Sequence, residues 1–231
     1  MRTRFQQGLD ELREKLLRMG GLAEQAVDRA CQAYVERDLT RCRMVLENES
    51  LINVAEREID EIAFDLLALQ QPMAIDLRFI LAVVKINADL ERVGDQAVNI
   101  AERVMDMVEL PKAELPVDIA RMAAAVSAMV RRALESFIEG KAELAHAVLE
   151  MDNVVDRMRD EAFITLVRKM NETPDVTRQA LDALLVARNL ERVADHATNI
   201  AEDVIFWVRG ADVRHNVGPE LVPHQEITDR H

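Results

Sequence analysis

Carboxylates recur at helical spacing in this sequence, and their chemistry suits the binding of cations. Residues 90–104 read LERVGDQAVNIAERV. With about 100° per residue and Glu91 at 0°, Asp95 lies at about 40°, Asn99 at about 80° and Glu102 at about 20°. Carboxylates at i and i+4 on one stripe repel each other, so the stripe needs a compensating charge. Arginines of a partner would supply it, as would a hard or borderline metal ion such as iron, manganese, magnesium or calcium.

The same stripe occurs a second time. Residues 190–204 read LERVADHATNIAEDV, and eleven of the fifteen positions are identical to the first segment at an offset of 100 residues. Composition alone would give about one match, so the chain contains an internal duplication. Four residues repeat the stripe: Glu191, Asp195, Asn199 and Glu202. In both copies the apolar residues occupy the neighbouring sector of the helix, so the acidic stripe flanks the core.

Each half of the chain offers further polar residues that could complete a cation site. An earlier helix carries Glu49 and Asn53 at i and i+4, and a later one carries Asp152 and Asp156. The candidate metal ligands are therefore Glu49, Asn53, Glu91, Asp95, Asp152, Asp156, Glu191 and Asp195, with Asn99, Glu102, Asn199 and Glu202 as supporting residues. Asn53 is a poorer ligand than a carboxylate, which predicts a weaker first site. The alternative is a solvated charged face that nearby arginines neutralise.

Hydrophobic periodicity predicts an all-α protein of six long helices. Pro72, Pro116 and Pro174 are expected to open helices, while Gly140 and Gly210 are expected to stop them. The predicted helices span 4–35, 38–69, 72–108, 116–138, 141–170 and 173–209. A linker at 110–116 divides them into two tandem, duplicated three-helix bundles, with one continuous six-helix array as the alternative. The expected domains are 1–110 and 111–210, followed by a flexible tail at 211–231.

Composition excludes several classes of protein. The 231 residues carry a net charge of −13 and are 49% apolar and 3% aromatic. This charge disfavours nucleic acid and direct docking on anionic lipid, so contact with a membrane is expected only through partner proteins. No signal peptide and no apolar run near the ~18 residues of a membrane span occur, which predicts a cytoplasmic protein.

The sequence also lacks the motifs of an enzyme. It has no Gly-rich phosphate loop, no H-E-x-x-H and no nucleophile elbow. Glu143–His146 is a single E-x-x-H, whereas ferritin-like di-iron bundles need a pair. His196 lies off the acidic stripe and is expected on the surface or between helices. A ferritin-like metal-binding bundle and a plain helical scaffold remain as alternatives to a regulatory role.

The duplicated segments resemble the paired signature of the PhoU family of phosphate-transport accessory regulators. Three other stretches are similar to that family's pattern: residues 18–21 (RMGG), 71–78 (QPMAIDLR) and 206–210 (FWVRG). The resemblance covers about residues 5–210. It implies two three-helix bundles, a homodimer and no enzymatic activity.

The resemblance also implies a function. A member of this family would be a negative regulator of phosphate uptake and of the phosphate-starvation response. It would link the ATPase subunit of a phosphate ABC transporter to a sensor histidine kinase when phosphate is plentiful. Some members bind multinuclear iron or zinc clusters through paired E(D)-x-x-x-D motifs, which correspond here to Glu91–Asp95 with Glu49–Asn53 and to Glu191–Asp195 with Asp152–Asp156. Magnesium or manganese are the alternatives, as is a metal-free protein.

Overall fold

The fold is all-α, as predicted. The structure is a computed structural model that describes residues 4–211 and 213, and this part of the chain contains no β-strand. Its helices are α1 (Arg4–Glu36), α2 (Leu39–Gln70), α3 (Ala74–Val108), α4 (Ile119–Glu139), α5 (Ala142–Glu172) and α6 (Thr177–Arg209), with a 3-10 turn η1 (Pro174–Val176) before α6. The prediction of a flexible tail falls almost wholly outside the described residues.

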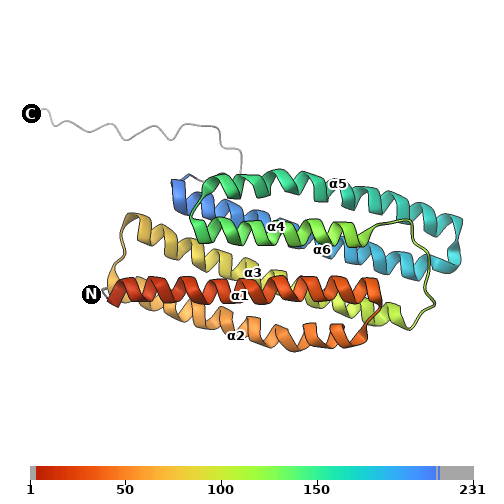
Figure 1. Ribbon diagram of the computed structural model, residues 1–231, viewed down its shortest axis with the longest axis horizontal. Coiled ribbons are helices and arrows are strands. Elements are labelled where there is room, and N and C mark those ends of the chain that lie inside the picture. The colour runs from red at the N-terminus through yellow and green to blue at the C-terminus, as the bar shows by residue number, and fades with distance from the viewer. Residues whose placement is uncertain (1–3, 212, 214–231) are drawn as a thin grey trace, which may run out of the picture.

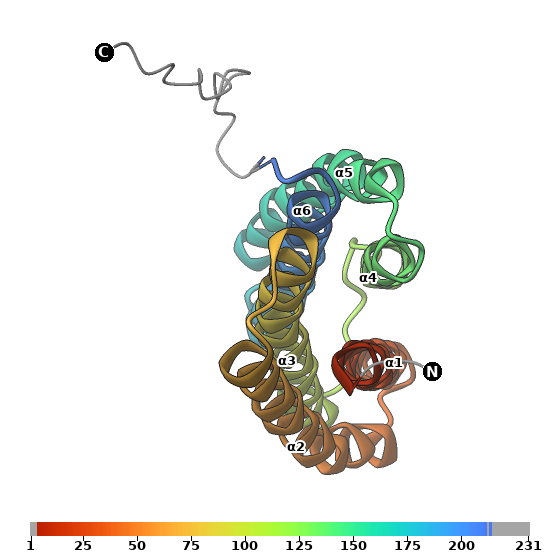
Figure 2. The same cartoon turned by 90° about the vertical axis from the view of Figure 1, so that its left-hand side faces the viewer.

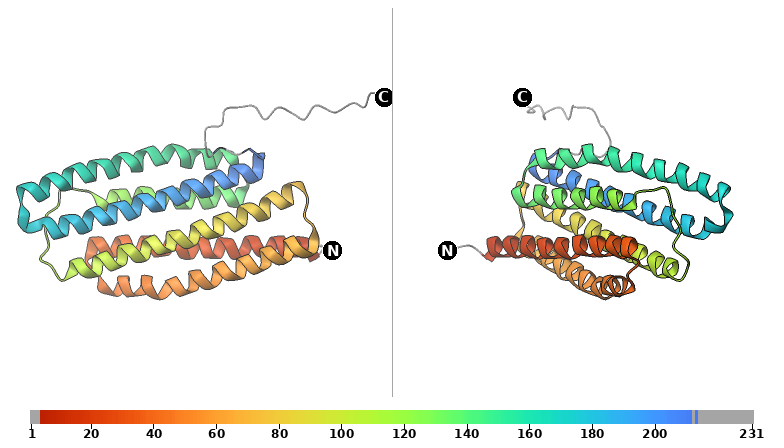
Figure 3. Two further views of the ribbon diagram at one scale, coloured as in Figure 1. Left: turned by 180° about the vertical axis from the view of Figure 1, so that it is seen from behind. Right: turned by 45° about the vertical axis from the view of Figure 1, so that its right-hand side comes forward.

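The helices form two layers (Figures 1 and 2). Helices α2, α3, α6 and α5 lie side by side in this order in one curved layer, which faces the viewer in the left view of Figure 3. Helices α1 and α4 form the second layer. Each repeat is a three-helix bundle, α1–α3 or α4–α6, but one cluster of buried apolar residues draws on all six helices. The two bundles therefore share a continuous core.

The central pair of the four-helix layer is α3 and α6, which run antiparallel. Lys85 Nζ lies 3.2 Å from Asp203 Oδ1, and Asp89 Oδ1 lies 2.9 Å from His196 Nδ1. Because one residue number rises along this contact while the other falls, the duplicated segments cross in opposite directions. At the end of the pair, Phe79 of α3 packs against Trp207 of α6 with ring centroids 5.1 Å apart.

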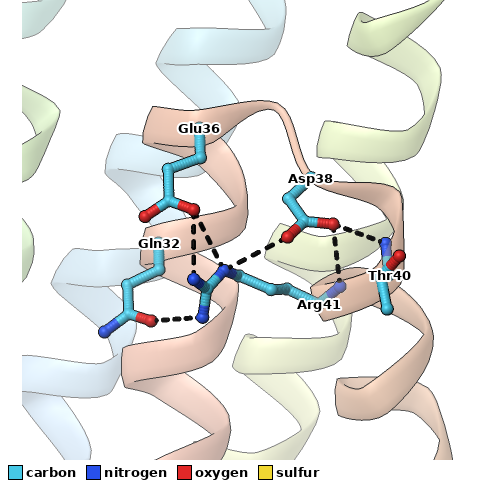
Figure 4. A network of polar contacts seen from close by, with 5 residues as sticks. All are labelled: Gln32, Glu36, Asp38, Thr40 and Arg41. Carbon is cyan, nitrogen blue, oxygen red and sulfur yellow. Dashed lines mark hydrogen bonds and ion pairs between the residues drawn. The ribbon is translucent and has the colours of Figure 1, made fainter.

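Side-chain caps set the turn between α1 and α2. Asp38 Oδ1 accepts hydrogen bonds from the backbone N–H groups of Thr40 at 2.8 Å and Arg41 at 3.3 Å, so this side chain caps the start of α2. The Arg41 guanidinium reaches back to α1, where Gln32 Oε1 accepts at 2.8 Å and Glu36 Oε2 at 3.2 Å (Figure 4). One arginine thus holds the ends of both helices in register.

Three predicted helix starts are wrong by a few residues. The third helix begins at Ala74 instead of Pro72, and the fourth begins at Ile119 because Asp118 caps it, three residues after Pro116. Pro174 opens a 3-10 turn, so the sixth α-helix begins at Thr177. The predicted stops hold, since Gly140 (φ 61°) and Gly210 (φ 70°) take the left-handed conformation that ends a helix.

Arg37 fixes the end of α3 against the turn after α1. Its Nη2 donates to the backbone carbonyls of Met107 at 2.7 Å, Val108 at 3.1 Å and Leu110. A cation at a helix C-terminus also interacts favourably with the helix dipole. This contact anchors the linker that leads from the first repeat to the second.

Gly94 in the duplicated segment allows α2 to approach α3 closely. A Cβ at this position would lie 2.8 Å from Ile52 Cδ1. At the equivalent positions of the second repeat the pair is Val155 and Ala194, which are also buried. The larger residue faces the smaller one in each copy, so the two repeats conserve volume by different means.

No described helix is both long and apolar enough to cross a membrane. Cys31 and Cys42 are buried as free thiols, and burial, followed by the charge of Asp28, raises the pKa of Cys31 to about 12. Both cysteines are therefore packing residues.

Replacing Arg37 by Ala should lower the free energy of unfolding by about 1 to 3 kcal/mol, because the carbonyls at the end of α3 lose a charged donor. Urea unfolding followed by circular dichroism measures this change. Arg43→Ala, at an exposed position of α2, is the control and should change stability by less than about 0.5 kcal/mol. Equal losses in the two variants would contradict the anchoring role.

Gly94→Ala should be better tolerated in an Ile52→Val background, which copies the pair of the second repeat. A double-mutant cycle should give a favourable coupling free energy of about 1 kcal/mol, because the removed Cδ1 atom vacates the space that the new Cβ needs. Additive effects would show that the approach of these two helices does not depend on this pair.

Candidate functional site

The helix packing places both acidic stripes beside the core, as predicted. On α3, Val93, Ala97 and Ile100 are fully buried in the core, while Glu91 and Asp95 are half-buried. The acidic stripe that flanks the core is therefore partly exposed to solvent and partly buried. Helix α2 lies along the outer side of α3, and α5 lies along the outer side of α6, so the two helices flank the central pair from opposite edges (Figure 3).

The first repeat gathers four carboxylates between α2 and α3, and we call this group the first acidic cluster: Glu49, Glu56, Glu91 and Asp95, with the Asn53 amide. Burial raises the pKa of Glu91, and the charges of Asp95, Glu56 and Glu49 raise it further, while Arg92 opposes them. The pKa of Glu56 is raised by burial and then by Asp60 and Asp95. These mutual effects show that the carboxylates of the two helices face one another.

A shallow hollow lies over this cluster. Its volume is about 480 Å³, and its lining includes Asn53, Glu56 and Glu91 together with Ser50, Val54 and Arg57. The hollow is open to solvent, so an ion or a partner side chain could reach the carboxylates from outside.

The second repeat gathers the equivalent carboxylates between α5 and α6, and we call this group the second acidic cluster: Asp152, Asp156, Glu191 and Asp195. Asp195 keeps contact with water on one side, but burial on the other side raises its pKa. The charges of Glu191, Asp152 and Asp156 add to this, so that the pKa reaches about 6. The pKa of Asp152 is raised by burial and by Asp156, against a hydrogen bond from Thr198.

The two clusters differ in one residue that the sequence reasoning missed. Arg159 of α5 places its Nη2 3.4 Å from Glu191 Oε1 and 3.8 Å from Asp156 Oδ1, while its Nη1 lies 2.8 Å from Asp160 Oδ1. The equivalent position in α2 is Glu56, at the same offset of 103 residues that relates Asn53 to Asp156. Extending the alignment of the repeats from α3 and α6 to α2 and α5 would have exposed this exchange.

The supporting residues lie in different places. Asn199 donates its Nδ2 to Asp89 Oδ1 at 3.2 Å, so it belongs to the contact between α3 and α6 and not to the second cluster. His196 contacts the same oxygen, which confirms its expected place between helices. Asn99 and Glu202 are half-buried, and Glu102 is exposed.

The sequence predicts a weaker first site because of Asn53, but the structure points the other way. Glu56 supplies a fourth carboxylate to the first cluster and Arg159 contacts the second, so the first cluster has the donor chemistry that fits a hard divalent cation better. Within residues 4–211 and 213, no three His, Cys, Asp or Glu side chains are already arranged to hold one ion. Carboxylates of half-exposed glutamates can turn toward an ion that neutralises them. Among the residues that the structure describes, no Lys, Arg or His lies within 4.0 Å of the four carboxylates of the first cluster, whereas Arg159 contacts Glu191 in the second.

Comparison with known proteins identifies the family. The PhoU domain family model matches residues 16–104 and 119–204, which are the two repeats. A protein of Pseudomonas aeruginosa named phosphate-specific transport system accessory protein PhoU homolog is 41% identical over 214 residues, covering 91% of this chain and 88% of that protein. A homologue of the same name from Pseudomonas putida is 42% identical and covers 91% and 83%.

Solved structures agree. The crystal structure of PhoU from Pseudomonas aeruginosa superposes with a TM-score of 0.86 at 39% identity, covering 90% of this chain and all of that one. The phosphate transport system regulatory protein PhoU from Streptococcus pneumoniae gives a TM-score of 0.80 at 25% identity, with 91% and 99% covered. Because both repeats match and these relatives span most of each chain, the chain belongs to the PhoU family.

Proposed function

We propose that this protein is a negative regulator of phosphate uptake and of the phosphate-starvation response. Its relatives are named as accessory proteins of the phosphate-specific transport system, and one is named as a regulatory protein. The PhoU family is a family of accessory and regulatory proteins, and the chain is not an enzyme. The observation that carries the proposal is the pair of acidic clusters, which lie at equivalent places in both repeats.

The clusters are suited to binding a basic protein surface. Both lie on the four-helix layer, and exposed leucines extend the same stripes: Leu81 of α3 (39% exposed) and Leu181 of α6 (46% exposed). Apolar side chains beside complementary charge are typical of protein–protein interfaces. The net charge of −13 favours basic partners in the same way.

The partners in this proposal are the ATPase subunit of a phosphate ABC transporter and a sensor histidine kinase. The protein would act as an adaptor between them when phosphate is plentiful, as a cytoplasmic homodimer that meets the membrane only through these partners. Two equivalent clusters on one layer support an adaptor because they offer two docking points on a rigid frame.

A divalent cation is a further part of the proposal. Glu49, Glu56, Glu91 and Asp95 would hold it with the Asn53 amide oxygen, and multinuclear iron or zinc, manganese and magnesium are the candidates. The bound cation would neutralise the repulsion among these carboxylates and draw α2 and α3 together at this point.

Removing the charge of the central carboxylates should abolish repression. The test is a plasmid copy of Glu91→Gln/Asp95→Asn/Glu191→Gln/Asp195→Asn in the source organism with the chromosomal gene deleted and phosphate plentiful. We expect alkaline phosphatase activity and phosphate uptake to rise sharply in the deletion strain. The wild-type copy should restore control and the quadruple variant should not.

The matched control removes four negative charges from the other layer, in α1 and α4: Glu11→Gln, Glu14→Gln, Glu135→Gln and Glu139→Gln. This variant should repress normally. Full repression by the cluster variant, present at normal levels and folded, would refute the assignment of the clusters. An unchanged deletion strain would refute the regulatory function itself.

The charge repulsion in the second cluster predicts a pH dependence. In the folded protein Asp195 has a pKa of about 6, above its ordinary value of 3.8. Protonation of Asp195 therefore stabilises the folded protein fully below about pH 4, and this contribution is lost as pH rises through about 6. In metal-free buffer, urea unfolding between pH 4 and 7.5 should show this loss in the wild type and a flatter profile in Asp195→Asn. Parallel profiles would contradict the repulsion.

A further inference from the structure

The two acidic clusters share a framework but not a charge balance. Glu91 and Asp95 correspond to Glu191 and Asp195 on the central helices, while Glu49 and Asn53 of α2 correspond to Asp152 and Asp156 of α5. Each cluster thus contains four carboxylates. The first has the Asn53 amide in place of one carboxylate, and Glu56 makes up the number. The second cluster has Arg159 at the position of Glu56, so only the second contains a positive charge.

The Arg159 guanidinium is held among carboxylates of both helices. It contacts Asp156 and Asp160 on its own helix and reaches across to Glu191 on α6. Its side chain is 38% exposed, but its Nε is shielded from solvent. A guanidinium in this place neutralises part of the repulsion without the dehydration that a metal ion requires.

Glu56 has the opposite effect at the equivalent place. It adds a fourth carboxylate whose negative charge lies close to those of Asp95 and Glu91. Arg57 and Arg92 lower the pKa of Glu56 and Glu91 from a distance, but neither makes an ion pair with the cluster. The first cluster therefore still needs a cation, whereas the second already has one.

We propose that Arg159 is a built-in counter-ion that excludes divalent cations from the second cluster, so that this protein binds metal in its first repeat only. This inference rests on the proposed cation binding, and it deepens that proposal by making the two repeats unequal. A divalent ion at the second cluster would have to displace the guanidinium from Glu191 and Asp156, or tolerate a positive charge about 4 Å away, which opposes binding at any effective dielectric.

The experiment exchanges the residue types between the repeats. Full-length protein freed of metal is titrated with Mn²⁺, and free Mn²⁺ is followed by electron paramagnetic resonance. We expect the wild type to bind Mn²⁺ at the first cluster alone, and Glu56→Arg to lose this binding. Arg159→Glu should also bind Mn²⁺ at the second cluster, with an affinity about tenfold or more above that of the wild-type second cluster. Adding Asp195→Asn should remove this binding again.

Arg157→Glu is the matched control, because it makes the same change of charge at an exposed position of α5 that has no ion pair in the described structure. It should leave Mn²⁺ binding as in the wild type. Arg159→Gln gives a milder test if Arg159→Glu unfolds, which thermal melting would reveal, and it should also increase binding at the second cluster.

Two results would overturn the proposal. One is a wild-type protein that fills both clusters, with separate sites removed by Asp95→Asn and by Asp195→Asn. The other is a folded Arg159→Glu or Arg159→Gln variant with no gain, or a gain that Arg157→Glu reproduces. A wild type without Mn²⁺ binding, combined with a gain in Arg159→Glu, would support the counter-ion while refuting metal at the first cluster. Repression in cells is measured separately, so failure of the regulatory function remains distinguishable.

Discussion

The antiparallel packing of α3 against α6 is the contact on which the rest of the structure depends. These two helices carry the duplicated segment, and their apolar faces supply the middle of the shared core. Since one side of each helix faces the second layer and another faces its partner, the remaining flank must carry the polar stripe. Helices α2 and α5 then cover that flank and bring their own carboxylates to it. The position of both acidic clusters follows from this one pairing.

Much of this arrangement can be predicted from the hydrophobic periodicity and the internal repeat of the sequence. The six helices, the stops at Gly140 and Gly210 and the acidic flank of α3 follow from local rules that tertiary packing does not override. The helix starts near Pro72 and Pro116 are wrong because a favourable first-turn residue does not compel a helix to begin there. At Asp118 a side-chain cap decides the start of α4 instead.

The limits of sequence reasoning are clearest at the clusters. Spacing on one helix places Glu91 beside Asp95, but it does not say which residues of the neighbouring helix meet them. Asn199 shares the stripe by angle, yet it donates to Asp89, because a buried carboxylate on α3 needs hydrogen-bond donors, and His196 also contacts it. Arg159 could have been found only by aligning the outer helices as well as the central ones.

If the first cluster binds a cation as proposed, the two repeats solve the same electrostatic problem differently. Like charges brought together at a helix pair are tolerated when a cation lies among them, and that cation can be a side chain or an ion. A duplicated protein can neutralise one acidic cluster with its own arginine and leave the other free to bind cations from solution. Such inequality would give an adaptor one constant docking face and one whose charge depends on bound metal.

The most direct test of this account is the anomalous diffraction of crystals grown with Mn²⁺ at neutral pH. The account predicts an anomalous peak between α2 and α3 beside Glu91 and Asp95, and none beside Arg159. A peak between α5 and α6, or two equal peaks, would contradict it.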